Sequence, residues 1–250
     1  MKTYRPDTIP VPDTQSDLLP VNELFYSIQG EGRWVGCPAC FLRLHYCSVG
    51  CSWCDTKYTW SPNQASEMEW VSPNDVLSRL IHLIPEPAHN QQAVHLVITG
   101  GEPLLFQEQL IPVVTNAKEF GFALVEVETS GTIAPIAELM EQVNWWNCSP
   151  KLSNSGLSAE RRIFREALSV IAGKGNADWK FVVRDERDVE EILRDYSELI
   201  PKDRVMLMPE GVTKNAQMQR LPLIGDLAMK YGFRVTARLH TLLWDNERGR

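Results

Sequence analysis

The sequence predicts an α/β fold whose strands are mostly parallel and form a partial (βα) TIM-like barrel. Two observations favour this fold: apolar segments of strand length alternate with segments of helical periodicity, and polar or glycine-rich motifs recur directly after the strands. Active sites of βα barrels lie at that carboxyl edge. A complete eight-fold barrel usually takes about 250 residues. This chain has 250 residues and a Pro-rich start, so we expect an incomplete barrel.

Seven strands and six helices are expected in alternating order. The predicted strands cover residues 41–46, 93–100, 122–131, 145–151, 179–184, 204–211 and 233–240. The predicted helices cover residues 72–84 and about 107–120, a short stretch from 135, a stretch from about 159, and residues 186–196 and 215–231. Strands that alternate with helices pair in parallel through right-handed crossovers.

Helix boundaries are indicated by capping residues. Ser72 is expected to cap the first helix, with Pro73 in the first turn and Asp75 at the position of a capping acid. Gly121 is expected to close the second helix, in which Pro112 is expected to cause a bend.

Composition narrows the class of protein. The net charge is −7 and the pI about 5.3, so we expect neither a nucleic-acid partner nor an anionic membrane surface. There is no signal-peptide pattern and no apolar run of about 18 residues, which favours a cytoplasmic protein. Residues 1–20 are expected to form a flexible Pro-rich extension, and residues 21–250 a single domain.

Five of the six cysteines fall within 18 residues, and the sixth is Cys148. Disulfides are disfavoured because cytosolic thiols stay reduced. Two CxxC pairs, Cys37 with Cys40 and Cys51 with Cys54, are the pattern of a structural zinc site. A thioredoxin-like redox pair at Cys37 and Cys40 is a further alternative.

The remaining interpretation takes Cys47, Cys51 and Cys54 as CxxxCxxC. A [4Fe–4S] cluster normally takes four thiolates, so three leave one iron open to a small molecule. This spacing is typical of radical S-adenosylmethionine (SAM) enzymes. The segment "TGGEP" (99–103) resembles the glycine-rich segment of that superfamily, in which a missing Cβ lets the backbone approach SAM. The resemblance implies a radical SAM partial barrel.

Further motifs narrow the resemblance to one family. The segments "FYSIQGEG", "FLRL", "CSWCDTKYTW", "VETSGT" and "CSPKLS" resemble the 7-carboxy-7-deazaguanine synthases, over roughly residues 21–250. That family implies a radical SAM carbon–nitrogen lyase that converts 6-carboxy-5,6,7,8-tetrahydropterin to 7-carboxy-7-deazaguanine with loss of ammonia, a step of 7-deazapurine and queuosine precursor biosynthesis. A glycyl-radical activating enzyme and, further away, a zinc-binding module remain as alternatives.

The resemblance also implies roles for single residues. The cluster ligands would be Cys47, Cys51 and Cys54, and Thr56 would bind Mg²⁺. The SAM contacts would be Trp53, Cys54, Asp55, Gly101, Ser149, Pro150 and Lys151. The substrate contacts would be Ile28, Gln29, Gly30, Arg43 and Thr99. From the residues alone, Arg43 could equally be a solvated strand residue, and Asp55 would be a better magnesium ligand than Thr56.

The family resemblance implies an electron donor of the flavodoxin or ferredoxin type and a homodimer. It also implies that the closing segment "LLWDNERGR" packs near the site. His240 is expected to end the last strand and to line the pocket. Cys37, Cys40 and the N-terminal extension lie outside the family pattern.

Overall fold

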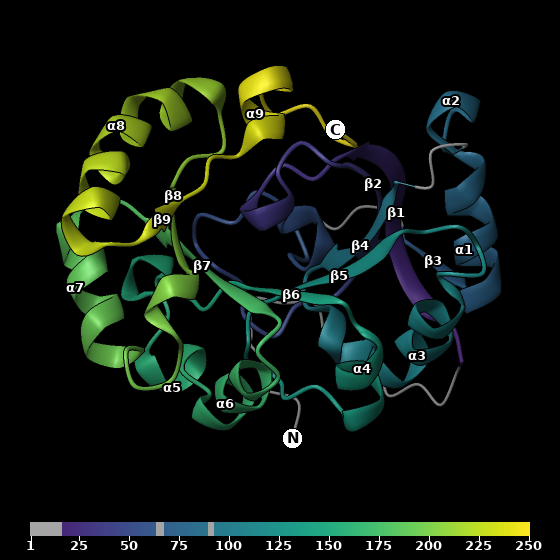
Figure 1. Cartoon of the computed structure of the whole chain (residues 1–250), viewed down its shortest axis with the longest axis horizontal. Helices are drawn as coiled ribbons and strands as arrows, with labels where there is room; N and C mark the ends of the chain where they lie inside the picture. Colours follow the sequence, from purple (N-terminus) through teal and green to yellow (C-terminus); the bar gives the residue numbers. More distant parts are fainter. Residues whose placement is uncertain (1–16, 64–67, 90–92) are drawn as a thin grey trace.

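The computed structural model describes residues 17–63, 68–89 and 93–250, and contains one nine-stranded sheet (Figure 1). The strand order is β3-β1-β2-β4-β5-β6-β7-β8-β9. The strands are β1 (Leu19–Ile28), β2 (Pro38–Leu44), β3 (Glu69–Val71), β4 (His95–Gly100), β5 (Leu124–Thr129), β6 (Trp145–Cys148), β7 (Ala177–Val183), β8 (Val205–Pro209) and β9 (Arg234–Val235). Neighbours from β2 to β9 pair in parallel, whereas β1 is antiparallel to both β2 and β3.

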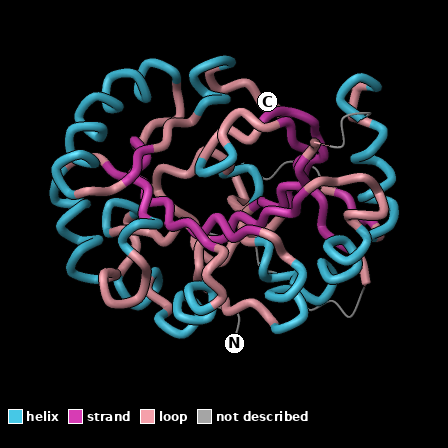
Figure 2. The backbone as a smooth tube through the Cα atoms, in the orientation of Figure 1, coloured by secondary structure: helices cyan, strands magenta, loops and turns pink. Residues whose placement is uncertain are grey.

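Helices cover the outer side of this sheet, which curves into an open arc (Figures 1 and 2). They are α1 (Pro73–His82), α2 (Glu86–His89), α3 (Gln107–Asn116), α4 (Ala137–Gln142), α5 (Ala159–Arg162), α6 (Arg165–Gly173), α7 (Glu186–Asp195) and α8 (Lys214–Tyr231). The last helix, α9 (Leu239–Trp244), lies at the opening of the arc instead (Figure 1). The two ends of the arc, β3 and β9, are edge strands of the sheet. The fold is therefore the expected partial barrel.

The core fills the space between the sheet and its helices. Its largest fully buried side chains are Trp146, Trp179, Tyr196 and Phe181. No helix within the described residues is long and apolar enough to cross a membrane. The concave side of the arc carries both polar and apolar side chains, among them Lys180, Glu128 and Phe41, and a cavity opens there.

Capping residues set the helix ends as expected in the first βα unit. The Ser72 hydroxyl accepts a hydrogen bond from the Asp75 backbone N–H at 3.2 Å, and Pro73 opens α1. Pro112 lies inside α3, but this helix ends at Asn116, and Gly121 follows in a turn with φ +93°. The predicted helix from residue 159 divides into α5, which ends before Ile163, and α6, which begins after Phe164.

Three expectations about the strands were wrong. No strand was expected at β1 or β3. Strand β1 begins at Leu19, inside the predicted extension, whose residues 1–16 lie outside the described residues. The predicted strand 233–240 shortens to β9, and His240 lies in α9. Both residues of β9 are exposed, so burial of side chains does not stabilise this edge strand, and it stays short.

Candidate active site

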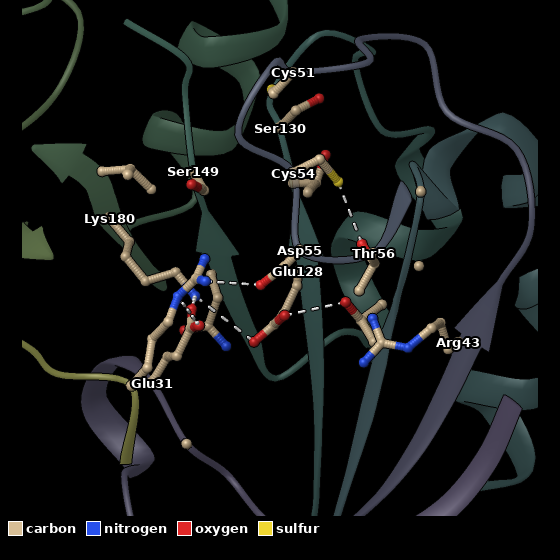
Figure 3. Close-up of a pocket in the computed structure, with 18 of the residues that line it drawn as sticks. Glu31, Arg43, Cys51, Cys54, Asp55, Thr56, Glu128, Ser130, Ser149 and Lys180 are labelled. Atoms are coloured by element: carbon tan, nitrogen blue, oxygen red, sulfur yellow. Dashed lines mark hydrogen bonds and ion pairs between the residues drawn. The ribbon is translucent and has the colours of Figure 1, made fainter. Parts of the chain in front are cut away.

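A cavity of about 190 Å³ opens at the carboxyl ends of the parallel strands (Figure 3). Most of the residues singled out from the sequence line it: Ile28, Gln29, Gly30, Arg43, Cys47, Cys51, Trp53, Cys54, Asp55, Thr56, Thr99, Gly101, Ser149 and Lys151. Pro150 is buried and does not line the cavity. His240 lines it from α9, and Arg250 from the C-terminal tail.

The cysteine loop (residues 45–60) follows β2 at this edge of the sheet. The Val49 backbone N–H donates to the Cys47 sulfur at 3.4 Å, and the Trp60 indole N–H donates to the Cys54 sulfur at 3.2 Å. Cys51 is buried against Val49 and Leu157. Burial raises the pKa of Cys47 to about 12. A metal bound there would displace the thiol proton.

The donor set fits an iron–sulfur cluster better than a single ion. Within the described residues, no three His, Cys, Asp or Glu side chains converge as ligands of one metal ion. Cys47, Cys51 and Cys54 nevertheless face one cavity. In a [4Fe–4S] cluster each thiolate binds a different iron, so the sulfur atoms stand farther apart than around one ion. Three soft thiolates on one loop are the donor type that such a cluster takes.

The two CxxC pairs do not form a zinc site. The Cys40 thiol donates to the Leu80 carbonyl of α1 at 3.5 Å, on the outer side of the sheet. Cys37 lies in the electrostatic field of Glu126 on the inner side. Because alternate residues of a strand face opposite sides, the two thiols point apart. Neither the zinc site nor a redox pair at Cys37 and Cys40 is supported.

Glycines let β4 approach the cysteine loop. Gly100 has φ +147°, and a Cβ there would lie 2.4 Å from the Leu44 carbonyl oxygen. A Cβ on Gly101 would lie 2.0 Å from the Tyr46 carbonyl oxygen and 2.9 Å from the Cys47 Cβ. The segment "TGGEP" therefore packs directly against the backbone that carries the first cysteine.

Glu102, the acid of the same segment, ties three loops together. Its buried carboxylate accepts hydrogen bonds from the Thr129 hydroxyl at 2.8 Å and from both the backbone N–H and the hydroxyl of Ser130. The Ser130 hydroxyl contacts Thr132 at 2.9 Å, and Thr132 contacts Ser48 of the cysteine loop at 2.9 Å. Glu102 thus supports the loop without lining the cavity.

Gln29 is occupied largely by protein partners. Its amide nitrogen donates to Glu126 at 3.2 Å and to Glu128 at 3.4 Å, and its amide oxygen accepts from the Glu31 backbone N–H at 3.2 Å. The residue is 1% exposed. Because both N–H donors are used, the side chain has one acceptor position left for a ligand. Gln29 therefore shapes the floor of the cavity more than it offers contacts.

A buried network continues below Gln29. Glu126 is fully buried and accepts hydrogen bonds from the Asn147 amide at 2.7 Å and contacts His95 Nδ1 at 2.8 Å. Gly30 lies beside this floor, where a Cβ would meet His240 at 1.9 Å, and the Leu239 N–H donates to the Gly30 carbonyl at 2.8 Å. The α9 segment is thereby fastened onto the loop after β1.

One wall of the cavity is built from opposite charges. Lys180 of β7 forms an ion pair with Glu31 and lies 3.8 Å from Glu128. Arg238 bridges Glu31 at 3.1 Å and Asp55 at 2.8 Å. We call Glu31, Glu128, Lys180 and Arg238 the polar wall, of which Figure 3 labels the first three. Burial opposes the charge of Glu31, but Lys180 and Arg238 outweigh it and hold the pKa of this carboxyl well below its usual range.

Arg43 faces the inside of the barrel, which answers a question that the strand pattern left open. Its Nε donates to Glu23 at 2.8 Å, and its guanidinium carbon lies 5.6 Å from the centre of the Phe25 ring. Phe25 stacks on Phe41 with ring centres 4.7 Å apart. Thr99 donates to Glu128 at 3.0 Å, on the next strand. A cation, two aromatic rings and a carboxylate thus surround one end of the cavity.

Further contacts involve Thr56 and the segment 149–151. The Thr56 hydroxyl lies 3.5 Å from the Cys54 sulfur. Lys151 donates to the Ser149 hydroxyl at 3.0 Å and lies 5.8 Å from the centre of the Trp53 ring. Trp53 itself donates to Asn154 at 3.1 Å. These contacts bring the segment 149–151 next to the cysteine loop.

The polar wall was missed by the sequence analysis. Glu31 and Glu128 stood in motifs that were quoted, and Arg238 precedes His240 in "RLH", but none was assigned a role. The signal for Lys180 was a charged residue inside the apolar segment "WKFVV", since a lysine in a buried strand needs a partner. Its partner lies 149 positions earlier, at Glu31, where no local pattern could identify it.

Comparisons with known proteins agree with this geometry. The family profile described as "4Fe-4S single cluster domain" matches residues 28–148. The chain is 39% identical over 231 residues to a 7-carboxy-7-deazaguanine synthase of Pyrobaculum aerophilum, a match that covers 92% of this chain and 96% of the relative. It is 34% identical over 251 residues to the enzyme of that name from Halobacterium salinarum, with 91% of each chain covered.

A solved structure supports the same assignment. The crystal structure of QueE from Escherichia coli superimposes with a TM-score of 0.65 at 28% identity, over 89% of this chain and 95% of that one. The partial barrel, the three cysteines facing one cavity and the extent of these matches lead to one conclusion. The chain belongs to the 7-carboxy-7-deazaguanine synthase family of radical SAM enzymes.

Proposed function

We propose that this protein converts 6-carboxy-5,6,7,8-tetrahydropterin to 7-carboxy-7-deazaguanine with release of ammonia. The observation that carries the proposal is the union, in one cavity, of a three-cysteine loop at one end and Arg43 with carboxylates at the other. The first is the donor set for a cluster with an open iron, and the second is suited to a pterin that bears a carboxylate.

Cofactor binding would be shared by the cysteine loop and its neighbours. Cys47, Cys51 and Cys54 would hold the [4Fe–4S] cluster. SAM would lie against Trp53, Asp55, Gly101, Ser149 and Lys151, with Pro150 supporting the last two from below. When bound, the cluster and SAM supply hydrogen-atom abstraction, and the protein positions the substrate and shields it from water. Gly101 packs so closely against Tyr46 and Cys47 that no Cβ would fit there.

Substrate binding would use the opposite end of the cavity. Arg43 offers its two Nη groups to the substrate carboxylate, and Thr99 and the backbone of Ile28 and Gly30 border the ring. A pterin presents adjacent N–H donors on its pyrimidine edge, which a carboxylate can accept in a bidentate manner. Glu31 and Glu128 line the cavity and provide such carboxylates. Each carboxylate has two acceptor oxygens, whereas Gln29 has one acceptor position left.

Four further assignments belong to the proposal. Thr56 would bind Mg²⁺ through its hydroxyl, with water and substrate oxygens completing the shell. A flavodoxin or ferredoxin would provide the electron that a radical SAM enzyme needs. A homodimer and a cytoplasmic location remain predictions.

The test is anaerobic turnover of the iron-reconstituted protein with SAM, a reductant and the carboxypterin, followed by mass spectrometry of the products. We expect 7-carboxy-7-deazaguanine, ammonia and about four irons per chain. The Cys51→Ala variant is the matched control and should yield neither product. Reconstituted wild type that cleaves SAM but leaves the carboxypterin unchanged would contradict the proposed substrate.

A further inference from the structure

We propose that Glu23 on β1 is a positioning residue that orients the Arg43 guanidinium for the carboxylate of the pterin. This inference rests on the proposed function, because it takes the substrate carboxylate as the ligand of Arg43. Glu23 is not among the residues that line the cavity, so it acts through Arg43.

The contacts of Glu23 join three separate segments. Glu23 is the direct partner of Arg43 in the β1–β2 pairing, and one carboxylate oxygen accepts from Arg43 Nε at 2.8 Å. The same oxygen accepts a hydrogen bond at 2.9 Å from the hydroxyl of Tyr58, which belongs to the cysteine loop. The other oxygen accepts from Arg248 Nε of the C-terminal tail. With 12% of its side chain exposed, Glu23 is an enclosed hub rather than a surface partner.

The geometry fixes the plane of the Arg43 guanidinium. Glu23 contacts Nε, which leaves the two Nη groups for a ligand in the cavity. The Phe25 ring, 5.6 Å from the guanidinium carbon, restricts rotation from a second side. A guanidinium binds a carboxylate most strongly when two parallel N–H groups meet its two oxygens, so its orientation decides the affinity.

Two other carboxylates compete with the substrate for the Arg43 guanidinium, so its orientation has to be fixed. Asp55 and Glu128 line the same cavity and both act electrostatically on Arg43. An Arg43 released from Glu23 would turn toward these two carboxylates, and the substrate carboxylate would then have to displace one of them. Removing the negative charge of Glu23 should therefore weaken substrate binding, although simple electrostatics would predict stronger binding.

The experiment compares wild type with Glu23→Gln, using SAM-loaded, reconstituted protein in anaerobic equilibrium dialysis. The ligands are the carboxytetrahydropterin and the same tetrahydropterin without its carboxylate. We expect binding of the carboxylated ligand to weaken about ten-fold, the size of a lost charge-assisted hydrogen bond, and binding of the other to change less than about two-fold. In turnover, KM should rise more than kcat falls.

Glu69→Gln is the matched control, because Glu69 forms an exposed ion pair with Arg79 at 2.7 Å on β3, outside the cavity. It should leave both affinities unchanged. Glu23→Gln that keeps or strengthens the preference for the carboxylated ligand would overturn the inference. If Glu23→Gln loses its cluster, the Glu23→Asp variant is measured in its place. Its shorter side chain keeps the negative charge but moves it away from Arg43. A preference for the carboxylated ligand that is the same as in wild type would then overturn the inference. Wild type that shows no preference would instead contradict the proposed substrate.

Discussion

The two sides of the cavity are held together by different kinds of interaction. The cysteine loop is fixed mainly by its backbone contact with Gly101 and by the hydrogen bond between Ser48 and Thr132, with one ion pair from Asp55 to Arg238. The polar wall is fixed by ion pairs between residues as distant as Glu31 and Lys180. Steric fit therefore governs the cofactor side, and charge balance governs the substrate side. Substitutions should affect the two sides through different measurable quantities.

The largest effect is expected from Gly101→Ala. A Cβ at this position would lie 2.0 Å from the Tyr46 carbonyl oxygen and 2.5 Å from its carbon, both backbone atoms that cannot turn aside. The cysteine loop would have to move, so we expect at least a hundred-fold loss of turnover, on the order of a misplaced catalytic group. Iron content and SAM affinity should fall with it, as measured by iron assay and calorimetry.

Gly173→Ala is the control for the Gly101 substitution. Gly173 ends α6 with ordinary backbone angles, and a Cβ there would meet nothing within 4 Å. This variant should retain iron, SAM binding and turnover. Gly101→Ala protein that also retained all three would show that steric fit does not set the cofactor side.

The next effect is expected from Glu31→Gln, which tests the polar wall. Lys180 and Arg238 would each lose one buried partner, although Glu128 and Asp55 remain beside them. Breaking a buried pair typically costs about 3 kcal/mol of unfolding free energy. Urea denaturation at pH 7 should show that loss with unchanged iron content. Glu69→Gln, at an exposed pair, should cost less than about 1 kcal/mol.

The same variant carries a pH signature. Since folding lowers the pKa of Glu31 from its usual 4.5, this carboxylate stabilises the fold above pH 4.5 and loses that contribution as the pH falls below it. The difference in unfolding free energy between wild type and Glu31→Gln should therefore shrink as the pH falls from 4.5. A difference that stayed constant over that range would contradict charge balance as its cause.

A smaller effect is expected from Thr56→Val, which asks whether the cysteine loop also serves the substrate side. The change removes the hydroxyl but keeps the side chain's shape. If Thr56 binds Mg²⁺, the Mg²⁺ concentration for half-maximal turnover should rise about ten-fold, since one of few protein ligands is lost. Iron content should not change. Thr115→Val, on α3, is the control; an identical magnesium response in both variants would exclude Thr56 as a ligand.

The cofactor side was more predictable from the sequence than the substrate side, for a physical reason. Cys47, Cys51 and Cys54 lie within one loop, so their spacing alone indicates a shared ligand. The strands and helices of the parallel sheet follow from local periodicity, and most were placed within a few residues. Strand β1 was missed because six of its ten residues are only partly buried, which blurs the alternation.

The polar wall could not be predicted, because its charges are recognisable only after folding. A lone Lys180 in an apolar strand signals a missing partner but does not name it. Arg238 looked like the end of a strand, whereas it joins the last strand to α9 and reaches both Glu31 and Asp55. The protein partners of Gln29 could not be predicted for the same reason, since Glu126 and Glu128 come from a distant strand.

The smallest effect is expected from Arg248→Ala, which separates the C-terminal tail from the substrate side. The Arg248 side chain is 49% exposed and its guanidinium lies 4.2 Å from the centre of the Tyr58 ring. Exposed ion pairs contribute about 0–1 kcal/mol and weaken with salt, so KM for the carboxypterin should rise at most about three-fold at low salt and less at high salt. Glu23 would still hold Arg43. A rise as large as that of Glu23→Gln would instead mean that the tail, rather than β1, sets the orientation of Arg43.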